Sequence, residues 1–234
     1  MGMDKGGIKG GIPGITGVLT FIVMTVNLYL IFIWVPEEKT LGLVQKIFYF
    51  HVGTAWVAFF AFFIVFVYSI LYLKTQQNKW DRIAAASAEI GTVFTTVVLI
   101  TGPIWAKSSW NTWWTWEPRL TTSLILWFIY LAYILVRGSS IGYEKKARLS
   151  AVFGIIGFID VPIVFLSVRW WNVSHPMLFE GGKMNLAPEM LLTLLVSVAS
   201  FTLLYFFYLE KTVAIFHAHD DVAEMKREIR ETMS

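Results

Sequence analysis

IFYFHVGTAWVAFFAFFIVFVYSILYL, residues 47–73, is a run of 27 residues without Asp, Glu, Lys or Arg. A helix needs about 20 apolar residues to cross the hydrocarbon core of a bilayer, so this run predicts a membrane-spanning helix. Five further runs are long and apolar enough to do the same, and none alternates with the period of two that a barrel strand requires. They occupy residues 15–35, 84–105, 120–136, 149–168 and 187–209. The sequence therefore predicts an all-α integral membrane bundle of six transmembrane helices.

The composition supports this class and excludes several others. Hydrophobic residues make up 56% of the 234 residues and charged residues 15%, with a mean hydropathy of +0.63, which lies far from the balance of a soluble domain. The chain has no Cys, which excludes a disulfide or a thiolate ligand within it. It has no basic stripe with interleaved aromatics and no Gly-rich phosphate loop, so we expect neither nucleic-acid binding nor ATP hydrolysis.

The chain is expected to form one membrane domain, residues 1–234, with three parts. Residues 1–14 are Gly-rich, carry Lys5 and Lys9 ahead of the first apolar run, and predict a flexible cytoplasmic terminus followed by a retained signal anchor. Residues 15–209 form the bundle, with a Trp-rich segment at 106–119. Residues 210–234 are charged, with apolar residues at helical spacing, and predict a solvated, partly frayed helix in the cytoplasm.

The Lys and Arg residues predict the orientation of the bundle. With both termini in the cytoplasm, only six of the nineteen fall on the outer side: Lys39, Lys46, Lys107, Arg119, Arg169 and Lys183. The positive-inside rule favours this orientation. It places the Trp-rich segment on the outer side, together with the loops at residues 35–46 and 169–188.

Four of the eleven Trp residues lie close together in WNTWWTWEPRLT, residues 110–121. They are Trp110, Trp113, Trp114 and Trp116. Anchoring at the headgroup level explains one or two of them. Four within seven positions favour a flat aromatic platform for a planar, largely apolar ligand.

The four His residues divide between the two sides of the predicted bundle. His51 and His175 fall on the outer side with the Trp-rich segment, and His217 and His219 on the cytoplasmic side. Neutral imidazoles from two separate elements can hold a metal from opposite faces, so His51 and His175 suit the axial positions of haem iron. Alternatively, His51 packs in the bundle or caps a helix and His175 is an ordinary loop residue. Their shared position beside the Trp-rich segment favours ligation.

Three cations on the same side are candidates for binding the two haem propionates. Arg grips a carboxylate through two parallel hydrogen bonds, and Lys supplies a point charge. Arg119, Arg169 and Lys46 have suitable positions. For Arg169 and Lys46, snorkelling to the membrane interface explains the position equally well.

These residues resemble a known family. WNTWWTWEPRLT is similar to the tryptophan-rich signature of haem-handling proteins in c-type cytochrome maturation. His51 in QKIFYFHVGTAW and His175 in DVPIVFLSVRWWNVSHP match the flanking histidines of the CcmC family. The similarity runs from about residue 41 to 209. The common family pattern has Gly where Asn111 stands and Asp where Glu117 stands.

The resemblance implies a protein of the bacterial or archaeal plasma membrane that is not an enzyme. It would bind haem b transiently at the outer face and deliver it to the haem chaperone CcmE. Its partners would be the ABC transporter components CcmA and CcmB and the small membrane protein CcmD. Trp110, Trp113, Trp114, Trp116 and Arg119 match the motif and would contact the haem, which His51 and His175 would ligate.

Glu117 and Pro118 lie at the predicted start of the fourth helix. Pro suits the first helical turn and biases the preceding residue toward an extended cap conformation, and a carboxylate there suits the helix dipole. Glu117 is thus either purely structural or helps to orient haem or dock the chaperone.

Two other classes remain open from the residues alone. A membrane-embedded electron-transfer cytochrome would hold haem permanently, usually between histidines within the bundle. A transporter subunit would use charged residues within the spans, Asp160 and Glu89. We expect structural roles for Asp160, Glu89 and Asn27. Asp160 is expected at a site where Pro162 kinks the helix.

Overall fold

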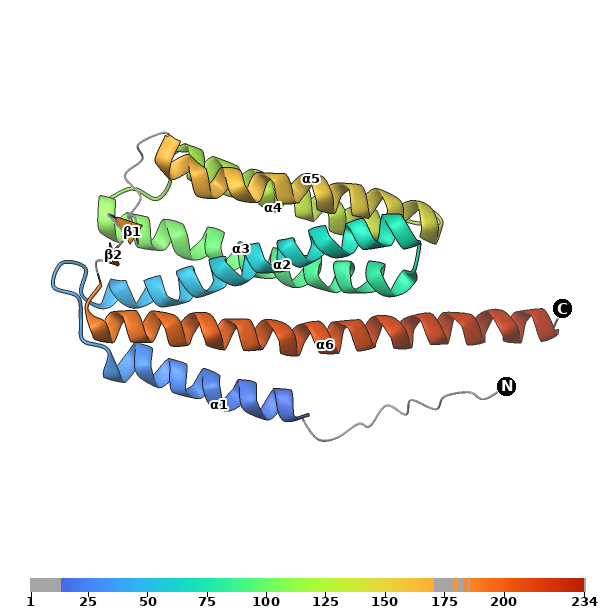
Figure 1. Ribbon diagram of the computed structural model, residues 1–234, viewed down its shortest axis with the longest axis horizontal. Coiled ribbons are helices and arrows are strands. Elements are labelled where there is room, and N and C mark those ends of the chain that lie inside the picture. Colours follow the sequence, from blue (N-terminus) through green and yellow to red (C-terminus); the bar gives the residue numbers. More distant parts are fainter. Residues whose placement is uncertain (1–13, 171–178, 181–182, 185, 234) are drawn as a thin grey trace.

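The computed structural model describes residues 14–170, 179–180, 183–184 and 186–233. This part of the chain forms six long helices and one short hairpin (Figure 1). The helices are α1 (Ile15–Tyr29), α2 (Lys46–Thr75), α3 (Asn78–Trp110), α4 (Pro118–Gly138), α5 (Tyr143–Trp170) and α6 (Pro188–Met233), and the hairpin pairs β1 (Phe179–Glu180) with β2 (Lys183–Met184). All six helices are long and apolar enough to cross a membrane. The first span consists of α1 and the π-helical turn that follows it at Leu30–Trp34. The prediction of an all-α fold with six helices of membrane-spanning length and hydropathy is confirmed.

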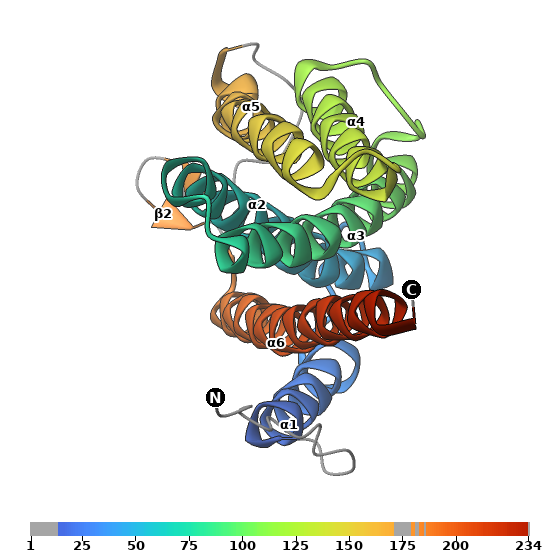
Figure 2. The same ribbon diagram turned by 90° about the vertical axis from the view of Figure 1, so that its right-hand side faces the viewer.

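The helices lie roughly parallel to one long axis in stacked layers (Figures 1 and 2). The pair α4 and α5 forms one outer layer, α2 and α3 form the middle, and α6 lies between that middle layer and α1. Only Gln76 and Gln77 connect α2 to α3, and Gln76 takes the left-handed conformation at φ 55°. Such a short connection makes these two helices antiparallel neighbours.

Helix α2 contributes to every buried core cluster of the described residues, together with side chains of α3, α4, α5 and α6. Phe62 of α2 stacks on Tyr130 of α4 at a centroid distance of 3.6 Å, and both are fully buried. Close approach depends on small residues, as is usual between membrane helices. A Cβ added at Gly91 of α3 would come within 2.6 Å of Phe62, and one at Gly53 of α2 would come equally close to Phe201 of α6.

Helix α6 runs without a break through residue 209, where the predicted span ends, to Met233, so the helix expected in the charged segment continues the sixth span. Its 46 residues correspond to a length of about 69 Å at 1.5 Å per residue, against a hydrocarbon core of about 30 Å. The part that the sequence divided off as a separate tail is therefore the projecting end of the same helix (Figure 1). Its last residues, from Asp221 onward, are exposed.

Candidate functional site

His51 lies in the second turn of α2, at the end of the bundle that carries the Trp-rich segment. Its ring Nδ1 lies 2.9 Å from the hydroxyl oxygen of Thr101 in α3. Gly102, the next residue of α3, leaves room for the ring, since an added Cβ there would lie 3.3 Å from the His51 Cε1 atom. His51 thus packs against α3, while its Nε2 atom forms no hydrogen bond with the part of the chain that the structure describes.

The Trp-rich segment leaves α3 through a left-handed residue. Trp110 ends the helix and Asn111 follows at φ 56°. Lys107 Nζ donates to the Asn111 side-chain oxygen at 2.8 Å and to its backbone carbonyl at 3.3 Å. Gly is the usual residue in this conformation and Asn is the next best tolerated. The departure from the family's Gly is therefore compatible with the same turn.

The Trp rings do not form one flat platform. Trp114 and Trp116 meet edge to face, with an interplanar angle of 78°, and Trp110 packs at 89° against Trp105 of α3. Trp113 and Trp116 are 59% and 75% exposed. The expectation of a flat shelf is thus wrong in its geometry: the segment presents two exposed indole rings and two that pack at steep angles.

Buried polar groups gather at the same end of the bundle. The indole nitrogens of Trp105 and Trp114 and the hydroxyls of Ser109 and Thr121 are buried, and none has a hydrogen-bond partner among the described residues. An unsatisfied buried donor costs about 1–3 kcal/mol. Spacings of four residues place Thr101, Trp105 and Ser109 on one face of α3, the face that His51 contacts. This set of donors fits a ligand that supplies acceptors, as a carboxylate does.

Glu117 and Pro118 start α4 as the sequence predicts. Glu117 is the extended N-cap residue at φ −67° and ψ 153°, and Pro118 occupies the first turn. The Glu117 carbonyl accepts the backbone N–H of Thr121 at 3.0 Å. Burial raises the pKa of the Glu117 carboxyl above its usual value, and the positive charge of Arg119 partly opposes that shift.

The three candidate cations lie in different settings. Arg119 lies in the first turn of α4, directly after the Trp-rich segment. Lys46 begins α2, but its ammonium donates to the carbonyl of Phe32 at 2.9 Å. It lies five positions before His51, which corresponds to a rotation of roughly 140° around the helix. Arg169 lies in the last turn of α5. His175 lies outside the described residues.

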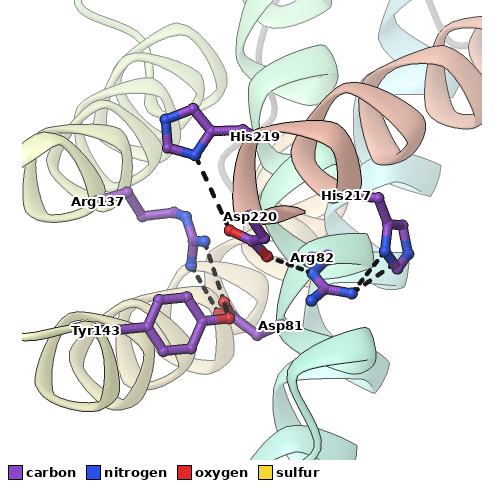
Figure 3. Close-up of polar contacts among 7 residues, drawn as sticks. All are labelled: Asp81, Arg82, Arg137, Tyr143, His217, His219 and Asp220. Carbon is purple, nitrogen blue, oxygen red and sulfur yellow. Dashed lines mark hydrogen bonds and ion pairs between the residues drawn. The ribbon is translucent and has the colours of Figure 1, made fainter. Parts of the chain in front are cut away.

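The opposite end of the bundle carries an ion-pair network that sequence reasoning did not single out (Figure 3). The carboxylate of Asp81 in α3 accepts two hydrogen bonds from Arg137 of α4, at 2.7 and 3.1 Å, and a third from the Tyr143 hydroxyl of α5 at 2.8 Å. Next to it, Arg82 binds Asp220 of α6 at 2.8 Å.

His217 and His219 belong to this second end. His217 Nδ1 lies 2.8 Å from Nη1 of Arg82, and His219 lies 4.0 Å from Asp220 (Figure 3). No cluster of three or more His, Asp or Glu residues suited to a metal occurs among the residues searched, which are those that the structure describes. The predicted separation of His51 from His217 and His219 is confirmed.

The polar residues within the spans have separate environments. Asn27 of α1 is fully buried and accepts a hydrogen bond from Ser197 of α6 at 2.7 Å, which fits the structural role expected for it. Glu89 faces outward. Asp160 is half-buried, and its Oδ2 atom has no hydrogen-bond partner in the described ranges.

The six long apolar helices, with His51 and the Trp-rich segment at one end of the bundle, are those of a multi-pass membrane protein. Residues 8–231 match the family model described as "Heme exporter protein C". The chain therefore belongs to the Heme exporter protein C family.

Individual relatives agree with the family model. The chain is 34% identical over 188 residues to "Heme exporter protein C" of Bradyrhizobium diazoefficiens, covering 80% of this chain and 71% of that protein. It is 35% identical over 182 residues to the "Putative cytochrome c biosynthesis ccmC-like mitochondrial protein" of Marchantia polymorpha, covering 76% and 77%. "Heme exporter protein C" of Escherichia coli K12 is 32% identical over 158 residues, 68% of this chain and 64% of that protein.

Proposed function

We propose that this chain binds haem b transiently at the end of the bundle that carries the Trp-rich segment and delivers it to the haem chaperone CcmE. This end faces the outer side of the plasma membrane, and both termini lie in the cytoplasm. The protein acts beside the ABC transporter components CcmA and CcmB and the small protein CcmD. The names of the relatives support the general role, since they refer to haem export and to cytochrome c biosynthesis.

The observation that carries the proposal is the position of His51. Its ring contacts Thr101 of α3, on the helix face that also carries the buried indole nitrogen of Trp105 and the buried hydroxyl of Ser109, neither of which has a partner among the described residues. An Nε2 lone pair is what an axial ligand of haem iron supplies. His175 would supply the second ligand. The haem is cargo here, so the site must hold it against water and still release it.

Other residues of the end are assigned by their chemistry. The indole rings of Trp110, Trp113, Trp114 and Trp116 would pack on the edge of the macrocycle. Arg119, in the first turn of α4 after the Trp-rich segment, would bind a propionate, because Arg grips a carboxylate through two parallel hydrogen bonds.

Three further assignments complete the proposed site. Arg169 is proposed for the second propionate. Lys46 would bind the same propionate only after its ammonium leaves the Phe32 carbonyl, to which it donates a hydrogen bond in this structure. Glu117, at the cap of α4, is proposed to orient haem or to contact the chaperone.

Haem content in purified variants tests the proposal. His51→Ala and His175→Ala are each expected to lower the haem recovered with the protein and the haem transferred to CcmE, and the double variant should lose both. His217→Ala and His219→Ala are the matched controls, because they remove the same side chain at the opposite end of the bundle. Unchanged haem content and transfer in the double variant would overturn the proposal.

The same preparations separate transient binding from a permanent cytochrome. Substoichiometric haem that leaves the protein when CcmE is added is the expected result. A full complement that stays bound in the presence of CcmE would instead indicate an electron-transfer cytochrome.

A further inference from the structure

The contact between Thr101 and the ring of His51 bears on which ring nitrogen carries the proton. A neutral imidazole has one N–H and one lone pair, and the hydrogen bond made by one nitrogen sets the state of the other. The only hydrogen bond of the His51 ring with a described residue joins Nδ1 to the Thr101 hydroxyl at 2.9 Å. The direction of this bond therefore fixes whether Nε2 presents a proton or a lone pair.

The Thr101 hydroxyl has already committed its proton within α3. Its oxygen lies 2.8 Å from the carbonyl of Val97, one turn earlier, which is the usual bond of a helical Thr to the carbonyl four residues before it. A hydroxyl has one proton and two lone pairs. When the hydroxyl donates to the Val97 carbonyl, its oxygen can only accept a hydrogen bond from His51, which places the ring proton on Nδ1.

A second threonine of the same helix shows this arrangement with no ambiguity of direction. Thr96 donates to the carbonyl of Thr92 at 2.8 Å while its oxygen lies 2.9 Å from the indole nitrogen of Trp127. An indole N–H can only donate, so Thr96 must donate to its own helix and accept from the ring. The distances around Thr101 are the same, 2.8 and 2.9 Å.

We infer that Thr101 is a positioning residue that holds His51 in the Nδ1–H tautomer and thereby directs the Nε2 lone pair toward the ligand site. Gly102 allows this contact, because the His51 ring lies against the space that a side chain there would occupy. The inference rests on the proposed function for its purpose, which is iron ligation. The tautomer itself can be measured without haem.

Nitrogen NMR of the haem-free protein with labelled His tests the tautomer directly. Assignment uses the signal lost in His51→Ala. We expect the wild type to show protonated Nδ1 and unprotonated Nε2 for His51, and Thr101→Ser to keep this state because it keeps the hydroxyl. In Thr101→Val the Nε2–H form should appear. A wild type in the Nε2–H form, or a Thr101→Val spectrum identical to the wild type, would overturn the inference.

Haem binding gives a second readout. Loss of a hydrogen bond that orients a ligating His typically weakens metal binding by roughly 10–100-fold. Thr101→Val is expected to show such a loss in haem affinity and a shifted midpoint potential of the bound haem, and Thr101→Ser should restore both. Thr95→Val is the matched control, since that buried hydroxyl donates to the carbonyl of Gly91 in its own helix and has no hydrogen bond to a ring among the described residues.

Two patterns of failure are distinguishable. If His51→Ala leaves haem binding intact while the NMR shows the expected tautomers, the proposed function fails and the tautomer assignment stands. If His51→Ala abolishes haem binding but Thr101→Val matches the wild type in NMR, affinity and potential, the positioning role of Thr101 is wrong and the proposed function stands.

Discussion

The guanidinium of Arg137 meets the carboxylate of Asp81 through two parallel hydrogen bonds, and the side chain of Asp81 is only 2% exposed. This ion pair joins α3 to α4, and the Tyr143 hydroxyl adds α5. It lies at the opposite end of the bundle from His51, because Asp81 is near the start of α3 and His51 is near the start of its antiparallel neighbour α2. The two ends therefore have separate roles: charged groups hold the helices together at one end, while the other presents unpartnered donors.

Breaking this pair should destabilise the bundle without changing the ligand site. Asp81→Asn leaves the largely buried Arg137 without its countercharge, and removing one partner of a buried pair typically costs about 3–5 kcal/mol. Thermal unfolding of the detergent-purified protein measures the loss. Arg227→Ala, which removes an exposed ion pair at the end of α6, should leave the unfolding temperature unchanged. Equal effects of the two substitutions would contradict the assigned role of Asp81.

Replacement of Asn111 is expected to preserve stability only when the new residue is Gly. Its φ of 56° costs other L-residues roughly 1–2 kcal/mol, so Asn111→Val should lower stability and Asn111→Gly should not. Thermal unfolding checks this, with Gln76, the other left-handed residue after a helix, substituted in the same way for comparison. A Val variant as stable as the Gly variant would show that the turn can relax.

Trp105→Phe is expected to change apoprotein stability and haem affinity in opposite directions. The substitution removes a buried indole N–H that has no acceptor in the described structure, so the haem-free protein should gain up to about 1–3 kcal/mol, less any loss of packing. If that N–H binds a haem carboxylate, haem affinity should fall. Trp56→Phe, at a half-exposed ring of α2 outside the proposed site, serves as the control. Loss of stability together with unchanged affinity would assign Trp105 to packing alone.

The raised pKa of Glu117 predicts a pH dependence. A carboxyl whose folded pKa exceeds its unfolded pKa binds more protons when folded, so stability falls as the pH rises between the two values. Glu117→Gln removes the titration. It should therefore be more stable than the wild type above the folded pKa and differ less below the unfolded value. Thermal unfolding across this range measures the difference, and a constant offset at every pH would contradict the assignment.

Much of the fold follows from local sequence features. Long apolar runs predict the spans, and Pro118 after Glu117 predicts the start of α4, where the structure places it. The position of His51 near one end of its span predicts that it shares that end with the Trp-rich segment. These features depend on residues close together in the chain.

The rest depends on pairs that the sequence does not bring together. Asp81 and Arg137 lie 56 positions apart. Each taken alone predicts only an ordinary charged residue at a helix end, so the sequence does not predict their ion pair. The bond between His51 and Thr101 spans 50 positions and depends on the register of α2 against α3. The angles between the Trp rings depend on side-chain rotamers, which no spacing rule provides. Helix α6 continues beyond residue 209, where the apolar run ends, because many of the polar residues that follow are good helix formers.

The most direct test of the central claim is the optical spectrum of haem bound to His51→Gly, recorded with and without added imidazole. If His51 is an axial ligand, the variant should lose the low-spin spectrum of haem held by two histidines, and imidazole entering the vacated space should restore it. A low-spin spectrum identical to that of the wild type without imidazole would show that His51 does not ligate the iron.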